Sequence, residues 1–188
     1  MEVKEFRFLH VLDKYDKQYE SWSRAYEYPV VIKSIVKEFG VLHTKWGQPL
    51  TIHNTAWGSE GDHVKFRDEL DSYHHWKCRH SDIVGEDIYD ITQPTTKTYD
   101  VVLNVSTLEH LEPVQQKYAL TNLIKQVKPK GLLILTFDYP RVDKSFLEDV
   151  FKYQCDRNGV ILNGINSVRP NPSYSGLEII LLVAQKGE

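Results

Sequence analysis

Two apolar runs of the sequence, residues 100–105 and 132–137, end in side chains that can contact a ligand. Neither run alternates strictly between apolar and polar residues, which is typical of parallel strands buried on both faces. Ligands of open α/β sheets bind at the carboxyl ends of such strands. We therefore expect a crevice where the runs end, bordered by Asn104, Val105, Ser106, Asp138 and Tyr139.

The rest of the chain alternates between helix-like and strand-like patterns, as in a parallel sheet covered by helices. Residues 13–39 carry apolar side chains at helical spacing, and Pro29 predicts two helices that meet near residues 27–29. Another helix is expected before the Lys-Pro-Lys-Gly turn at residues 128–131. Strands are expected at residues 50–57, 74–81, 88–92, 100–105, 132–137, 160–166 and 176–183, and further helices at 62–71 and 143–157.

These elements predict an α/β fold: a three-layer sandwich with a mostly parallel seven-stranded sheet. The last two strands flank a turn-rich stretch and would form a C-terminal antiparallel hairpin. The length of 188 residues fits a single domain, with residues 1–45 as a helical cap and 48–188 as a Rossmann-like core. No apolar run reaches the roughly 18 residues that span a bilayer, so we expect no membrane partner.

Charge and cysteine content narrow the class of protein further. A net charge of −3 offers no long-range attraction to phosphates, so a nucleic-acid partner is not expected. The charged N-terminal residues do not resemble a signal peptide, and only Cys78 and Cys155 are available for a disulfide. We therefore expect a cytoplasmic protein.

Residues 99–111, Tyr-Asp-Val-Val-Leu-Asn-Val-Ser-Thr-Leu-Glu-His-Leu, and 123–136, Leu-Ile-Lys-Gln-Val-Lys-Pro-Lys-Gly-Leu-Leu-Ile-Leu-Thr, carry a family resemblance. In order and register they resemble strands four and five of class I S-adenosylmethionine (SAM) dependent methyltransferases. The resemblance implies SAM as cofactor and methyl transfer to an acceptor. Residues 27–29, Glu-Tyr-Pro, resemble a segment of some sugar- and polysaccharide-modifying relatives, which points to a saccharide or another small molecule as acceptor.

The resemblance also implies a cofactor loop after the first strand. In the family this loop has an acidic residue and two glycines, which let backbone amides approach the methionine moiety. Here Asn54 stands at the acidic position, Ala56 at the first glycine and Gly58 at the second, and Trp57 lies between them. A structural turn that binds no cofactor is the alternative interpretation.

Further cofactor contacts follow from the next strands of the family. Asp82 is expected to accept both ribose hydroxyls, with Glu86 as runner-up and a helix-capping role as the alternative. Asp90 would accept from the adenine amino group while Ile91 covers the ring; an exposed Asp-x-Thr turn is the alternative. Side chains from the end of the fourth strand would lie beneath the methionine part of SAM, namely Asn104, Val105 and Ser106.

Three residues are candidates for contact with the acceptor. His110 is a candidate general base, although the Leu-Glu-His triplet of the family favours a role in shaping the cofactor floor. Asp138 and Tyr139 are expected at the mouth of the crevice, or in a turn before Pro140. His74, Cys78 and His80 alternate along one strand, but they lack a zinc-finger spacing and a fourth ligand, so no metal site is predicted.

Two other classes of protein are alternatives. The altered glycine loop would suit a non-catalytic relative that binds SAM or its demethylated product, S-adenosylhomocysteine (SAH), or serves as a scaffold. A nicotinamide-dependent oxidoreductase would bind adenosine in the same place, but it would require Gly-x-Gly-x-x-Gly after the first strand and no closing hairpin.

Overall fold

The computed structural model describes residues 24–40, 48–55, 61–84, 87–139, 149–150, 153, 160–168 and 178–187. The elements within them are α1 (Arg24–Phe39), β1 (Leu50–Asn54), α2 (Asp62–Ser72), β2 (Trp76–His80), β3 (Tyr99–Val105), the 3-10 helix η1 (Leu108–His110), α3 (Pro113–Gln126), β4 (Val127–Tyr139), β5 (Val160–Val168) and β6 (Glu178–Lys186). None of the helices in this part of the chain has the length and apolar character needed to cross a membrane.

The described strands form one mixed sheet in the order β2-β1-β3-β4-β6-β5. The first four strands run parallel, whereas β6 is antiparallel to both β4 and β5. This confirms the α/β fold and the closing hairpin. The sheet has six strands within the described residues instead of the seven expected.

The missing strand is the one predicted at residues 88–92. Here Ile88 makes a single parallel bridge with Asp82, and the chain then turns at Asp90. Both the backbone N–H and the hydroxyl of Thr92 donate to the Asp90 carboxylate, at 2.8 and 2.7 Å. The prediction of a strand was wrong because these side-chain hydrogen bonds favour a turn over an extended ladder.

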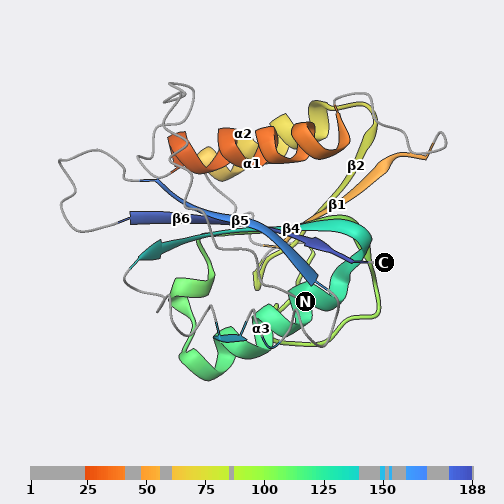
Figure 1. Cartoon of the computed structure of the whole chain (residues 1–188). Coiled ribbons are helices and arrows are strands. Elements are labelled where there is room, and N and C mark those ends of the chain that lie inside the picture. The colour runs from red at the N-terminus through yellow and green to blue at the C-terminus, as the bar shows by residue number, and fades with distance from the viewer. Residues whose placement is uncertain are drawn as a thin grey trace.

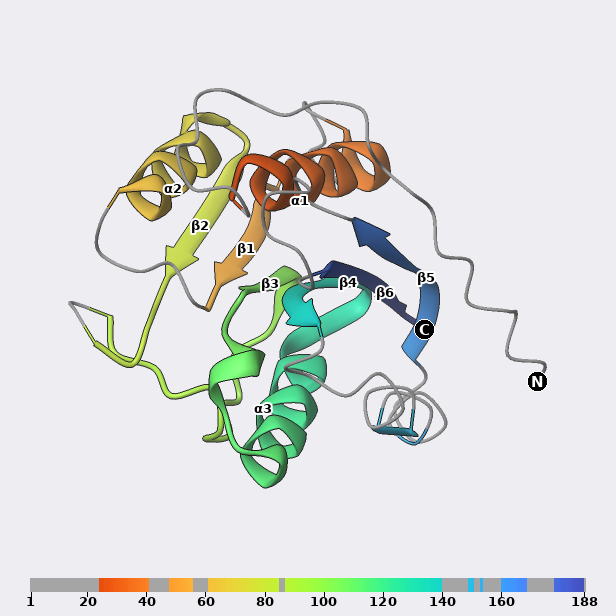
Figure 2. The same ribbon diagram turned by 90° about the vertical axis from the view of Figure 1, so that its left-hand side faces the viewer.

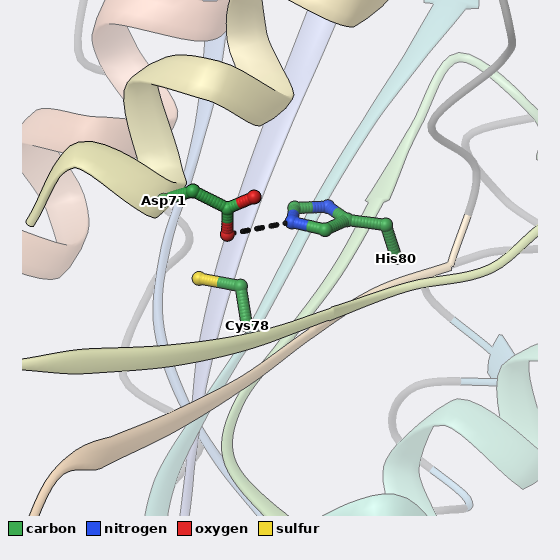
Figure 3. Close-up of side chains that lie close together, drawn as sticks. All are labelled: Asp71, Cys78 and His80. Carbon is green, nitrogen blue, oxygen red and sulfur yellow. Dashed lines mark hydrogen bonds and ion pairs between the residues drawn. The ribbon is translucent and has the colours of Figure 1, made fainter.

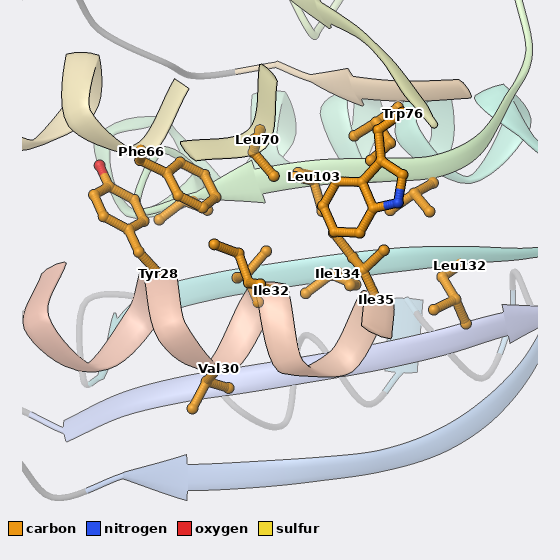
Figure 4. Close-up of a cluster of buried hydrophobic side chains, with 14 of the residues drawn as sticks. Tyr28, Val30, Ile32, Ile35, Phe66, Leu70, Trp76, Leu103, Leu132 and Ile134 are labelled. Carbon is orange, nitrogen blue, oxygen red and sulfur yellow. The ribbon is translucent and has the colours of Figure 1, made fainter. Parts of the chain in front are cut away.

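The sheet lies between two layers of helices (Figure 1). Helices α1 and α2 cover one face and α3 covers the other, and the turned view in Figure 2 shows the same arrangement. The α1/α2 side holds one apolar core, in which Tyr28 stacks on Phe66 with ring centroids 4.0 Å apart (Figure 4). On the α3 side a second core includes Leu120, Leu123 and Phe137. The side chains of successive residues in β3 and β4 pack in opposite cores, which explains why the two sequences do not alternate between apolar and polar residues.

Helix α1 passes through Pro29 without a break. The predicted junction of two helices near residues 27–29 was therefore wrong. Proline removes one backbone hydrogen bond, but Tyr28, Val30 and Val31 on either side of it are buried against the sheet and α2. Burial of each such side chain contributes about 1.5 to 3 kcal/mol, which offsets the local cost of the proline.

A buried polar network lies beneath the sheet on the α3 side. The His53 ring on β1 is fully buried, and its two nitrogens lie 2.7 Å from Gln126 Oε1 and 2.7 Å from Ser81 Oγ. Gln126 also donates to the Tyr89 hydroxyl at 2.8 Å. Burial lowers the pKa of His53 to about 4. The folded protein therefore keeps this ring neutral at physiological pH.

We predict that His53 makes the protein less stable as the pH falls from about 6.5 to 4. Over this window the unfolded chain binds a proton at the imidazole that the folded chain excludes, so stability rises with pH. Chemical unfolding at several pH values measures the slope, which should amount to a few kcal/mol over the window. In His53→Asn the slope should be flatter, whatever the absolute stability. Equal slopes in the two proteins would contradict the buried neutral ring.

Candidate functional site

A buried carboxylate ties α1 to the carboxyl ends of two central strands. Glu27 is only 2% exposed, and its Oε1 accepts hydrogen bonds from Ser106 Oγ at 2.6 Å and from the Thr136 hydroxyl. Its Oε2 accepts from Arg24 Nη1 at 2.5 Å. The Arg24 side chain is itself largely buried and lies over the Tyr28 ring. Glu27 thus has partners for both oxygens, and it fixes the helix over the strand ends.

Ser106 stands just beyond β3 in a left-handed backbone conformation, with φ of 47°. Its N–H donates to the Thr136 carbonyl at 2.9 Å, while its hydroxyl reaches Glu27. A non-glycine residue in this region is strained by about 1 to 3 kcal/mol, and such residues cluster at binding sites. Hydrogen bonds to β4 and to α1 hold Ser106 in this strained conformation.

The turn after Ser106 directs Glu109 into the protein. In helix α3, Gln116 donates from its side-chain amide to the carbonyls of Leu108 and Leu111, each at 3.0 Å, which fixes η1. Both carboxyl oxygens of Glu109 are buried, and they have no hydrogen-bond partner among the other described residues. Burial raises the pKa of Glu109 to about 8, and the negative charges of Glu27 and Asp138 add to the rise.

Asparagines at the ends of β1 and β3 complete this edge of the sheet. Asn104 is fully buried and donates from Nδ2 to Thr55 Oγ1 at 3.0 Å, and Asn54 Nδ2 lies 3.4 Å from His80 Nδ1. Within the described part of the chain, the Oδ1 atoms of both asparagines are buried without a partner. Buried acceptors of this kind are rare in folded proteins, and they indicate a donor that a ligand or solvent brings.

Tyr28, His63 and Asp82 form a second polar group at the same edge of the sheet. The Tyr28 hydroxyl lies 2.7 Å from His63 Nδ1, so α1 and α2 are joined above the end of β1. Burial lowers the pKa of His63, and the charges of Arg24, Glu27 and Asp82 also act on it. Asp82 is half-buried, and its Oδ1 accepts from the Ile83 N–H at 2.6 Å. The structure therefore brings Asp82 to the start of α2.

The other predicted cofactor residues lie in different parts of the structure. Val105 and Ile91 are both buried, but Val105 packs in the α1/α2 core and Ile91 in the α3 core. Asp90 is exposed and bonded to Thr92, the turn that the alternative interpretation anticipated. Ala56, Trp57, Gly58 and Glu86 lie outside the described residues, as does the side chain of Tyr139.

Of the acceptor candidates, His110 is exposed on η1, and Asp138 ends β4 in a half-buried position near Glu109. Sequence reasoning missed Glu27, Arg24 and His63 as members of the site. A Glu at the start of a helix gives no local sign of burial, because its partners lie far away in the sequence. The Leu-Glu-His triplet did mark Glu109 together with His110, and the structure buries the carboxyl group of the pair and exposes the imidazole.

Several solved structures that share this fold are SAM-dependent methyltransferases. The N-methyltransferase NodS from Bradyrhizobium japonicum, in complex with SAH, superposes with a TM-score of 0.63 at 13% identity over 94% of each chain. Magnesium protoporphyrin IX methyltransferase from Synechocystis, with bound SAM, gives 0.62 at 14% identity over 85% of this chain and 78% of that one. A SAM-dependent methyltransferase from Clostridium acetobutylicum gives 0.60 at 8% identity, over 90% and 93%. These identities establish the fold only.

Sequence comparison adds no further relative. No protein-family model matches the chain, and no curated protein matches it significantly. The likeness to methyltransferases therefore rests on the fold and on the sequence motifs at residues 99–111 and 123–136.

We predict that Glu27→Gln lowers the free energy of unfolding by about 3 kcal/mol, because it leaves the buried Arg24 charge without its counter-ion. Urea unfolding followed by circular dichroism measures the loss. Glu38→Gln is the matched control, since Glu38 is exposed on the same helix and its Oε1 accepts from Gln185 as a glutamine would. If both variants lose equally little stability, Glu27 does not anchor α1.

Proposed function

We propose that this chain is a SAM-dependent methyltransferase that modifies a small-molecule or saccharide acceptor. SAM would bind at the carboxyl ends of β1, β2 and β3. The proposal rests on the fold shared with methyltransferases and on the chemistry of the residues at this edge of the sheet. The antiparallel β6 beside β4 also favours it over a nicotinamide-dependent oxidoreductase.

The observation that carries the proposal is the row of buried acceptors along this edge. Asn104 Oδ1 and both oxygens of Glu109 are buried without partners among the other described residues. An unsatisfied buried acceptor costs about 1 to 3 kcal/mol, so three of them on β3 and on the 3-10 helix that follows it would be expensive in a purely structural region. SAM carries an amino group, ribose hydroxyls and an adenine amine, all of which donate.

The residues present fit this cofactor. Asp82 would accept from the ribose hydroxyls, since a carboxylate offers two acceptors to a vicinal diol. Asn104, Val105 and Ser106 would lie under the methionine part, and Glu27 keeps Ser106 in its left-handed conformation there. SAM supplies an activated methyl group when bound. The protein would contribute orientation and exclusion of water instead of a covalent nucleophile.

Glu109 is our candidate for the general base. A hydroxyl or amine acceptor loses a proton during methylation, and a carboxylate with a raised pKa near neutrality is suited to accept it. Glu109 is directed inward between Glu27 and Asp138, whereas His110 is exposed. A carboxyl group also pairs well with the hydroxyls of a saccharide, which agrees with the acceptor class implied by residues 27–29.

Calorimetric titration of the full chain with SAM and SAH tests the proposal. We predict binding that weakens about 10-fold to 100-fold in Asp82→Asn, through loss of charge-assisted hydrogen bonds to the ribose. Asp68→Asn is the control, because Asp68 is an exposed residue of α2 that pairs with Arg67. No binding of either ligand at millimolar concentration would favour the scaffold alternative and end the methyltransferase proposal.

Glu109 also has a test that needs no known acceptor. Its pKa of about 8 lies above that of the unfolded chain, so the folded state holds a proton that the unfolded state releases. The stability that this contributes is lost as the pH rises from about 4.5 through 8. We predict that Glu109→Gln, which stays neutral, loses less stability between pH 5 and pH 9 than the wild type, by a few kcal/mol. Equal losses would show that Glu109 is not a buried acid.

A further inference from the structure

A cluster of three side chains between α2 and β2 contains none of the residues assigned to the cofactor above. Asp71 comes from the last turn of α2, and Cys78 and His80 point from β2 toward it (Figure 3). The donor atoms of the three residues all lie within 4.8 Å of one another. Residues 78 and 80 share a face of the strand because side chains alternate with a period of two.

We propose that Asp71, Cys78 and His80 bind a zinc ion, with water as the fourth ligand. A thiolate, an imidazole and a carboxylate are the ligands that zinc takes in proteins, and three protein ligands plus water form an open tetrahedral site. The hard cations Mg²⁺ and Ca²⁺ prefer oxygen ligands and do not suit a sulfur donor. The zinc proposal does not rest on the proposed methyltransferase activity, although Asn54 borders both sites.

The geometry needs little rearrangement to accept the ion. Ligand atoms around tetrahedral zinc lie about 3.3 to 3.7 Å apart, and His80 Nε2 already lies 3.0 Å from Asp71 Oδ1. The Cys78 and His80 side chains are held by the strand, whereas the Asp71 carboxyl is 51% exposed and free to adjust. Its exposure also leaves a path by which the ion and a water molecule enter.

A hydrogen bond joins Asp71 and His80 before any ion binds. The Asp71 carboxylate accepts from the His80 ring at 3.0 Å, and the Cys78 sulfur lies within 4.8 Å of both donor atoms. Cys78 is a half-buried free cysteine, and its sulfur carries a proton in the free protein as an ordinary thiol does. Zinc displaces that proton to the solvent as the Zn–S bond forms, and no electrons are transferred.

Asn54 is placed to orient the His80 ring in the zinc form, because it lies next to Nδ1, the ring nitrogen that would not bind zinc. Zinc requires the Nε2 lone pair, which leaves the proton on Nδ1. Asn54 lies next to Nδ1, and its side-chain amide offers an oxygen acceptor as well as a donor. In the zinc form, Asn54 Oδ1 would accept from Nδ1–H and orient the ring.

His74, which the sequence pattern grouped with Cys78 and His80, is exposed in the turn before β2 and is not part of the cluster. The helix supplies Asp71 in its place. His74 is therefore a matched control for Asp71, because both residues are exposed and only Asp71 belongs to the proposed site.

The test is a zinc titration of the full chain after chelator treatment and dialysis, by calorimetry in buffers of different ionisation enthalpy. We expect one zinc ion and release of about one proton per ion. Cobalt should give a sulfur-to-metal charge-transfer band. Cys78→Ser and Asp71→Asn should weaken zinc binding by at least about 10-fold, whereas His74→Ala and Cys155→Ser should retain it.

Circular dichroism confirms that each variant is folded, and the exposed Asp71 makes loss of folding in Asp71→Asn unexpected. Three results would overturn the site: no zinc binding at 100 µM, on the order of the weakest useful metal affinity, wild-type affinity in Cys78→Ser, or a cobalt spectrum without the sulfur band. Any of these would leave the cluster as a hydrogen-bonded contact between α2 and β2.

Discussion

The contact between Glu27 and the ends of β3 and β4 is the interaction on which the rest of the site depends. A carboxylate at 2% exposure is costly unless it is paired, and Arg24, Ser106 and Thr136 together satisfy it. Through this one side chain, α1 is held over the strand ends. Without it, the strained Ser106 would keep only the hydrogen bond from its N–H to the Thr136 carbonyl among the contacts described above.

The buried Glu27 carboxylate also affects the ionisation of Glu109. Because Glu27 is negative and fixed, a second carboxyl group close to it resists ionisation, which contributes to the raised pKa of Glu109. Glu109 thereby gains the properties of an acid or base near neutrality without a histidine. The two carboxyl groups therefore differ. Glu27 has both oxygens satisfied and is structural, whereas Glu109 has no partner among the other described residues, which is why we propose it as the general base.

The sequence predicted the parts of the fold that local patterns determine. Residues 100–105 and 132–137 are buried on both faces, and their unbroken apolar character is a direct consequence. The same patterns predicted α2 and the closing hairpin. The continuous α1 could not be predicted, because the gain from burying Tyr28 and Val31 is a tertiary effect that outweighs the local signal of Pro29.

The site was predicted only in part for the same reason. The position of Asn104 and Ser106 at the end of β3 could be predicted because strand ends can be located from the sequence. Glu27 is bonded to Thr136, 109 residues further along the chain, and no spacing rule relates the two. The Asp71 ligand of the proposed zinc site likewise depends on how α2 packs on β2, which the alternating pattern of the strand does not contain.

A crystal structure of the full chain with SAH would test the central claim most directly. We expect SAH at the carboxyl ends of β1, β2 and β3, with its ribose hydroxyls bonded to Asp82 and a donor facing Asn104 Oδ1. The Glu27–Ser106 contact should be unchanged in the complex. SAH bound elsewhere, or an Asn104 Oδ1 that still lacks a partner in the complex, would contradict the account.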